Sequence, residues 1–186
     1  SDVRERIVSS LAEMDQMLQT TLAFAREGTE SESTSMTNLG ALVEAICDDL
    51  AELEYDVTAA IPDGIILPCR PVALKRALTN LIENAIRYGT CAVVDVRSDA
   101  QAAEIVIADS GPGIPAKDLE RVFLPFHRLD ASRNRETGGL GLGLAIAKRI
   151  VESHGGQIRL SNRDVGGLEV RVSLPVHFTK ELQDVK

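Results

Sequence analysis

The sequence predicts a two-layer α/β (α+β) sandwich, in which a mixed, largely antiparallel sheet carries helices on one face and one long helix precedes it. Two observations predict this fold class. About six short segments have the composition of strands, and several of them can pair as hairpins across turns. Amphipathic helical segments lie between them, and their apolar faces need a sheet to cover them. At 186 residues, the chain can form one ordinary domain plus an additional element.

Residues 2–26 are expected to form the long N-terminal helix. Its apolar side chains recur at alternating spacings of four and three residues, a heptad-like pattern that is carried by Ile7, Leu11, Met14, Leu18, Thr21 and Ala25. Such a face needs a partner helix, although an ordinary core helix of the same domain is the alternative interpretation. Residues 28–37 are small, polar and acidic, and they are predicted to be a linker.

The elements of the main domain follow in order. Asn38 can cap a first helix, and Pro71 can begin a second helix, where its missing N–H is not needed. The other predicted elements are strands 55–61 and 65–69 around a turn at 62–64, a hairpin of strands 91–97 and 103–108, a short helix at 115–123, a helix at 141–154, and a hairpin of strands 157–161 and 168–174. We expect this domain to cover residues 38–178 and a polar tail to cover residues 179–186.

Composition argues against several classes of protein. The formal net charge is −8, aromatic residues make up 3% and tryptophan is absent, so nucleic acid is not an expected partner. Cys47, Cys69 and Cys91 form no paired metal or disulfide pattern, which favours free thiols in a reducing compartment. No signal peptide and no apolar run long enough to span a bilayer are present. We therefore expect a cytoplasmic fragment of a longer protein.

Two glycine clusters predict a nucleotide pocket with a lid between them. The first is Asp109-Ser110-Gly111-Pro112-Gly113, and the second covers residues 138–144. Glycines let the backbone approach a ligand closely, and the helix predicted after the second cluster offers free N–H groups to a phosphate. The second cluster is no P-loop, because no Lys-Ser or Lys-Thr pair follows its glycines.

Polar side chains near these clusters suggest the rest of a pocket. Asn80 and Asn84 lie one turn apart on one helix face, and an amide oxygen beside polyphosphate suits Mg²⁺. The alternative is that both amides bond to neighbouring loop backbone. Arg87 could reach phosphate, and Tyr88 could lie against a flat base. Asp109 ends a predicted strand, where it could accept from an exocyclic amine or cap the next turn.

The three histidines show no metal or catalytic pattern. His127, His154 and His177 are not spaced as ligands, and we expect structural or peripheral roles, with His127 as a candidate for lining the pocket. His154 ends a predicted helix, where a positive charge would be favourable.

Four motifs together resemble the N, G1, F and G2 boxes of sensor histidine kinases. They are Asn-Leu-Ile-Glu-Asn-Ala-Ile-Arg-Tyr at 80–88, Asp-Ser-Gly-Pro-Gly-Ile at 109–114, Phe-Leu-Pro-Phe at 123–126 and Gly-Gly-Leu-Gly-Leu-Gly-Leu-Ala-Ile at 138–146. The resemblance covers residues 38–175, with the boxes in the family's order. It implies the Bergerat ATP-binding fold of the GHKL superfamily. Residues 1–27 resemble the second helix of the dimerisation domain that precedes it.

The same resemblance implies ATP and Mg²⁺ as ligands. Asn84 would hold Mg²⁺ with support from Asn80, and Asp109 would bind the adenine amine. Residues 128–139 would form the lid over ATP. The nucleotide-binding residues implied in this way are Asn80, Asn84, Arg87, Tyr88, Asp109, Gly111, Gly113, Ile114, Phe126, Arg128, Gly139, Leu140, Gly141, Leu142, Gly143 and Leu144.

Asn80 separates two classes within the superfamily. Relatives that resemble gyrase, the Hsp90 chaperones and MutL carry Glu four residues before the metal-binding Asn, where it activates water. This chain has Asn80 there, and Asn cannot act as a general base. The resemblance therefore implies a pocket that holds ATP for an external nucleophile. A water-using ATPase of the same fold and a non-catalytic nucleotide-binding or dimerisation module are the alternatives.

Two features of the sequence depart from the family pattern. Leu140 stands where Thr or Ser is usual, so a hydroxyl contact to phosphate is missing. The family's phosphorylated His is followed by an acidic residue, whereas the histidines here precede Arg128, Gly155 and Phe178. The expected function is transfer of the γ-phosphoryl of Mg-ATP to a histidine on a dimerisation helix outside this chain. The implied partners are that helix in a homodimer and a response-regulator receiver domain, with the parent protein in the plasma membrane.

Overall fold

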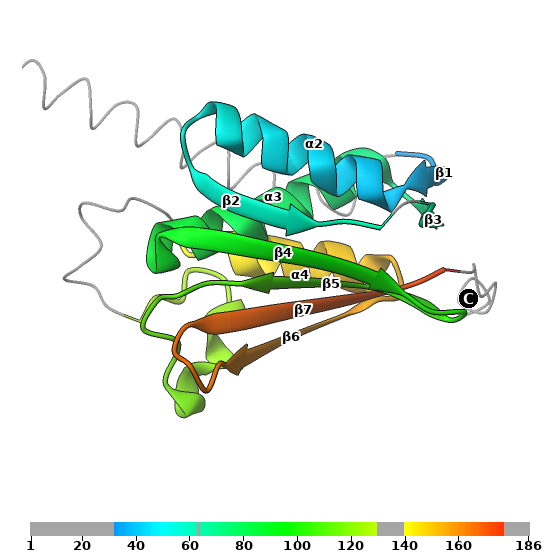
Figure 1. Cartoon of the computed structure of the whole chain (residues 1–186). Coiled ribbons are helices and arrows are strands. Elements are labelled where there is room, and N and C mark those ends of the chain that lie inside the picture. The colour runs from blue at the N-terminus through cyan, green and yellow to red at the C-terminus, as the bar shows by residue number, and fades with distance from the viewer. Residues whose placement is uncertain (1–31, 63, 130–139, 177–186) are drawn as a thin grey trace, which may run out of the picture.

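A five-stranded sheet forms one layer of the molecule (Figure 1). The computed structural model describes residues 32–62, 64–129 and 140–176. The strand order is β2-β4-β5-β7-β6, and only the β2–β4 pair is parallel within this sheet. The predicted mixed, largely antiparallel sheet is therefore confirmed. Its strands are β2 (Asp56–Ala60), β4 (Cys91–Ser98), β5 (Ala102–Ala108), β6 (Gln157–Asn162) and β7 (Leu168–Pro175).

Three helices form the second layer on one face of the sheet (Figure 1). They are α2 (Leu39–Glu52), α3 (Pro71–Gly89) and α4 (Gly143–Ser153). Side chains alternate across the strands, so Val94 of β4 is fully buried under the helices while its neighbour Val93 is 48% exposed. The core therefore lies between the helices and one sheet face.

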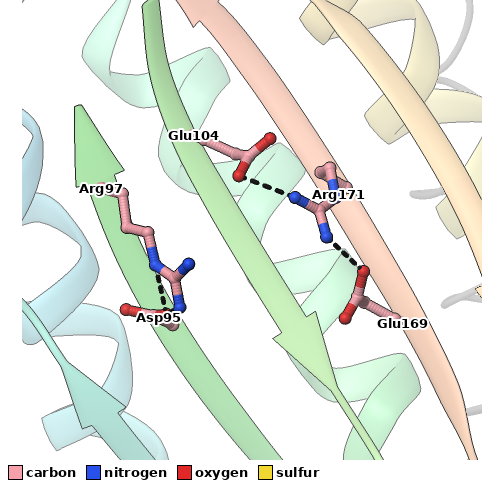
Figure 2. Close-up of polar contacts among 5 residues, drawn as sticks. All are labelled: Asp95, Arg97, Glu104, Glu169 and Arg171. Atoms are coloured by element: carbon pink, nitrogen blue, oxygen red, sulfur yellow. Dashed lines mark hydrogen bonds and ion pairs between the residues drawn. The ribbon is translucent and has the colours of Figure 1, made fainter. Parts of the chain in front are cut away.

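The opposite face of the sheet is polar and open. On this face, Arg171 of β7 donates to Glu104 of β5 (2.8 Å) and to Glu169 of its own strand (2.7 Å), as Figure 2 shows. Asp95 and Arg97 form another ion pair along β4. Exposed ion pairs of this kind contribute at most about 1 kcal/mol each, so their main effect is to keep the face hydrated.

Capping groups and a proline explain why α2 and α3 begin at the residues where they do. Asn38 caps α2 as predicted, because its Oδ1 accepts from the N–H of Ala41 at 3.1 Å. Pro71 is the first residue of α3, also as predicted. The cap of α3 comes from Glu32, whose two carboxylate oxygens accept from the N–H groups of Val72 (2.7 Å) and Ala73 (3.0 Å). A carboxylate there also complements the helix dipole.

A second, two-stranded sheet corrects the predicted linker. Residues 35–38 form β1 (Ser35–Asn38), which pairs antiparallel with β3 (Ile66–Cys69), so the linker expectation is wrong for residues 35–37. The two strands predicted on either side of the turn at 62–64 do not pair with each other. Instead, β2 belongs to the main sheet and β3 pairs with β1. Pairing with β1 lets β3 bury Leu67 and Cys69 against the helices.

Two further predictions need adjustment. The short helix predicted at 115–123 is a pair of 3₁₀ turns, η1 (Ala116–Asp118) and η2 (Arg121–Phe123). The last helix begins at Gly143 instead of 141, because Gly141 has a φ of +70°, which a right-handed helix does not contain.

Three predicted segments fall outside the described residues. They are the N-terminal helix, the tail at 179–186 and residues 130–139 of the lid predicted at 128–139. Among the helices that the structure does describe, none combines the length and the apolar character needed to cross a membrane. Cys47, Cys69 and Cys91 are free thiols, as predicted, and burial raises the pKa of Cys47 to about 11.

Candidate functional site

Asn80 and Asn84 lie on α3, where both are only partly exposed. Neither amide hydrogen-bonds to loop backbone anywhere in the described residues, and the Nδ2 atom of Asn80 is buried without a partner there. A Cβ built on Gly143 would lie 3.9 Å from Asn80, which places this amide beside the first turn of α4. Because that turn carries free N–H groups and the positive end of the helix dipole, the two elements form a polar corner that suits an anion.

Asp109 directly follows β5 and is only 5% exposed. Its Oδ1 accepts hydrogen bonds from the N–H groups of Gly111 (2.8 Å) and Leu168 (3.0 Å). Within the described residues its Oδ2 accepts none. One oxygen therefore caps the turn, which is one of the two roles expected for Asp109, while the other stays available to a donor such as an exocyclic amine.

The loop after Asp109 packs on the C-terminal end of α3. Gly89 touches the Asp109 side chain so closely that a Cβ at Gly89 would overlap it. A Cβ at Gly111 would lie only 2.5 Å from the carbonyl oxygen of Tyr88. Gly89 was missed by the sequence analysis, although a glycine in the last turn of a helix, next to Tyr88, was a usable signal.

The far end of this loop contacts the hairpin between β6 and β7. Gly113 has a φ of +72°, and a Cβ there would lie 2.5 Å from Oδ1 of Asn162. The next residue, Ile114, is buried and exchanges two hydrogen bonds with the Asn162 amide. Arg163 and Gly167 of the same hairpin contact the backbone of Asp109. The Gly166-Gly167 pair indicates the turn of this hairpin, but no local motif in the sequence marks Asn162 or Arg163.

The segment after η2 packs against the second glycine cluster. The N–H of Phe126 donates to the carbonyl oxygen of Gly141 at 3.0 Å, and a Cβ at Gly141 would lie 2.8 Å from the carbonyl oxygen of His127. Phe126 has a φ of +63° and is 60% exposed. A left-handed conformation at a bulky residue costs about 1–3 kcal/mol, which marks this segment as strained.

The other predicted site residues that the structure describes are either exposed at the surface or packed against the core. Arg87, Tyr88 and Arg128 are exposed, with Arg87 and Tyr88 at the end of α3. Leu142 is 1% exposed in the hydrophobic core, so its side chain does not line a pocket. Leu140 and Leu144 also pack against the core, and Gly139 lies outside the described residues. The leucines of this cluster thus orient its backbone, and any contact to a nucleotide there comes from main-chain atoms.

The donor set around α3 fits a magnesium ion held partly by phosphate. In the parts of the chain that the structure describes, no three His, Cys, Asp or Glu side chains gather in a group that could hold a metal ion. The available oxygens are the amides of Asn80 and Asn84, which are hard, neutral ligands. Mg²⁺ accepts such ligands when phosphate and water complete its shell.

These features place the chain in the class of α/β sandwich domains that bind nucleotides. A family model described as "Histidine kinase-, DNA gyrase B-, and HSP90-like ATPase" matches residues 69–177. The sensor histidine kinase CpxA of Escherichia coli strain K12 is 32% identical over 180 residues, which cover 93% of this chain and 39% of CpxA.

Solved structures agree with this match. The ATP-binding domain of PrrB from Mycobacterium tuberculosis has a TM-score of 0.65 at 26% identity, with 78% of this chain and 99% of that domain covered. The histidine kinase domain of the E. coli osmosensor EnvZ has a TM-score of 0.63 at 32% identity, with 85% of this chain and 98% of that domain covered. The chain therefore belongs to the family of histidine kinase-, DNA gyrase B- and HSP90-like ATPases, as the ATP-binding catalytic domain of a sensor histidine kinase.

Proposed function

We propose that this domain transfers the γ-phosphoryl group of Mg-ATP to a histidine on a dimerisation helix outside this chain. The phosphoryl group would then pass to an aspartate of a response-regulator receiver domain. The chain spans 39% of the length of CpxA, and the kinase relatives support this activity for the parent protein. In the proposed arrangement residues 1–27 are the second dimerisation helix, and the catalytic domain begins with β1 at Ser35 and extends to residue 178. The parent protein is a membrane-anchored homodimer with this domain facing the cytoplasm.

The observation that carries the proposal is the amide at position 80. Asn80 is four residues before Asn84 on the same helix face, beside the first turn of α4. An amide cannot take a proton from water, so this corner can bind polyphosphate without activating water. The buried carboxylates of the described residues are Asp109 and Asp118. Asp109 is bound to the turn after β5, and Asp118 pairs with Arg121 at 3.5 Å.

Each group then has a distinct role. Asn84 and Asn80 would hold Mg²⁺, which when bound neutralises phosphate charge. Free N–H groups in the first turn of α4 would bind the phosphates, and Oδ2 of Asp109 would accept from the adenine amine. Leu140 supplies no hydroxyl to phosphate. Catalysis would rest on positioning the γ-phosphoryl group for an external nucleophile.

One mixture tests the proposed transfer. The chain is incubated with labelled Mg-ATP and a separate dimerisation domain that carries the acceptor histidine. We expect acid-labile label on the acceptor and hydrolysis without acceptor well below about 1 s⁻¹, the low end of typical turnover numbers. Steady hydrolysis at that rate would instead identify a water-using ATPase. Nucleotide binding without label on any acceptor would identify a binding module.

Two substitutions assign the pocket in the same assay. Asp109→Asn preserves an oxygen for the N–H groups of Gly111 and Leu168 but replaces Oδ2 with a donor, so adenine recognition should be lost while the fold is kept. Asn84→Ala should remove the Mg²⁺ dependence of ATP binding. Unchanged Mg-ATP affinity in both variants would show that the pocket lies elsewhere.

A further inference from the structure

The turn between β6 and β7 holds both ends of the loop at 109–114. Five hydrogen bonds join the two segments, at the N–H, the carbonyl and the Oδ1 of Asp109 and at the N–H and carbonyl of Ile114. The partners lie 48 to 59 residues later in the chain. We call residues 162–168 the hairpin turn.

Asn162 holds the exit of the loop. Its Oδ1 accepts from the N–H of Ile114 at 2.8 Å, and its Nδ2 donates to the carbonyl oxygen of Ile114 at 2.7 Å. A primary amide can serve both backbone groups of one residue at once, whereas a carboxylate can only accept. The contact also explains the glycine at 113, where a Cβ would lie 2.5 Å from the same Oδ1.

Arg163 and Leu168 hold the entry of the loop. Nη1 of Arg163 donates to the carbonyl oxygen of Asp109 at 2.6 Å. Leu168 pairs with Asp109 through its carbonyl (3.0 Å to the Asp109 N–H) and through its N–H (3.0 Å to Oδ1). The bond to Oδ1 fixes the carboxylate, so the direction in which Oδ2 faces depends on where the hairpin turn lies.

We propose that Asn162 and Arg163 are positioning residues that set the selectivity of this domain for adenine. Neither residue touches the base in this scheme; both act through the 109–114 loop, which holds Asp109. A loop of this composition, with glycines at 111 and 113, loses much conformational entropy when it is ordered. The hairpin turn orders it before the nucleotide arrives, so Oδ2 is already aligned with the exocyclic amine.

The proposal rests on the proposed function, because it needs Asp109 to read the base. It predicts that variants of the hairpin turn lose affinity only for nucleotides whose base carries the exocyclic amine. ADP carries the amine and IDP has a carbonyl oxygen in its place, so the IDP/ADP ratio of dissociation constants measures the contact at Oδ2. Loosening the loop should weaken ADP binding and leave IDP binding nearly unchanged. General destabilisation would affect both nucleotides alike.

The test is calorimetric titration of the whole chain with Mg-ADP and Mg-IDP. For Asn162→Ala we expect ADP affinity to fall about tenfold, because ADP binding must then order a loop that has lost two hydrogen bonds of ordinary strength. The IDP/ADP ratio should fall with it. Asn38→Ala is the matched control, because it also removes an asparagine that bonds to backbone, at the start of α2. It should lower thermal stability and leave the ratio unchanged.

Two further variants keep the test decisive if Asn162→Ala folds poorly. Asn162→Asp retains the acceptor for the Ile114 N–H and loses the donor, and Arg163→Met retains the aliphatic stem and loses the bond to Asp109. Both should lower the ratio. Folded variants with the wild-type ratio would overturn the proposal. A wild-type chain that does not prefer ADP to IDP would overturn the base-reading role of Asp109 itself.

Discussion

At the scale of single residues, His154 shows how burial reverses an expectation from the sequence. At the end of α4 a positive charge would be favourable, yet here the Nε2 of His154 accepts from the N–H of Arg70 at 3.0 Å. The other nitrogen, Nδ1, must then carry the proton and donate to the carbonyl of Ile150 at 2.7 Å. Burial lowers the pKa of His154, and the nearby Arg70 charge lowers it further. The backbone of Ile150 and the charge of Glu32 act in the opposite direction.

This neutral histidine predicts a loss of stability in mild acid. The pKa of His154 is lowered from 6.5 in the folded state, so the unfolded state takes up a proton more readily. The His154 contribution to the free energy of unfolding is therefore complete above about pH 6.5 and is lost as the pH falls further. Urea unfolding should show that the free energy of unfolding decreases between pH 8 and pH 5.5. In the His154→Asn variant this decrease with pH should be smaller.

A direct titration checks the assignment. The His154 ring resonance, identified from its absence in His154→Asn, should titrate below pH 6.5 in the folded chain. His127→Asn is the matched control, since it removes another histidine and should leave the His154 titration unchanged. A His154 resonance that titrates above pH 6.5 would contradict the neutral tautomer.

At the scale of elements, the hairpin turn connects the sheet to the site. Gly166 and Gly167 both have positive φ values, +91° and +94°, so each is placed where an L side chain is strained. Their surroundings differ. A Cβ on Gly166 would meet nothing within 4 Å, whereas a Cβ on Gly167 would overlap the backbone of Asp109. The pair therefore separates backbone strain from contact with the 109–114 loop.

Substituting the two glycines should give unequal results. Gly166→Ala should cost about 1–2 kcal/mol of unfolding free energy, which is the strain of a left-handed residue. Gly167→Ala should cost about 3–5 kcal/mol, because overpacking against Asp109 adds to the same strain. Chemical denaturation measures both values, and ADP titration should show weakened binding only for Gly167→Ala. Equal costs for the two variants would mean that the turn can move away from Asp109.

At the scale of the whole molecule, the sheet has one covered face and one open face. The helices bury Val94 completely, while Val93, the previous residue of β4, faces the polar side. That side carries Arg171 between Glu104 and Glu169 (Figure 2). A two-layer arrangement of this kind tolerates charge on only one of its sheet faces.

Adjacent substitutions on β4 test this asymmetry. Val94→Asp should cost about 3–5 kcal/mol or abolish folding, because it places an unpaired carboxylate in the core. Val93→Asp should cost about 1 kcal/mol or less, since its side chain is hydrated. Circular dichroism melts of both variants provide the measurement. A Val93→Asp variant as unstable as Val94→Asp would show that another surface covers the open face.

Much of the architecture could be predicted from the sequence because it depends on local pattern. The 3.6-residue period of α3 placed Asn80 and Asn84 on one face, and Asn38 and Pro71 marked helix starts that the structure confirms. Asp109 was correctly placed at the end of a strand. Hydrogen bonds and steric limits over a few residues determine all of these features.

The tertiary structure alone decided which distant segments hold the site. The contacts of Asn162 with Ile114 and of Arg163 with Asp109 join positions 48 and 54 residues apart, and no periodicity or turn signal encodes such a pair. β1 is a second example, because its composition is that of a linker and only its pairing with β3 makes it a strand. The sequence by itself determined most of the local elements and the side chains that are proposed to bind a nucleotide. Packing of the sheet determined how those side chains are held, because long-range contacts depend on the whole set of neighbours being present at once.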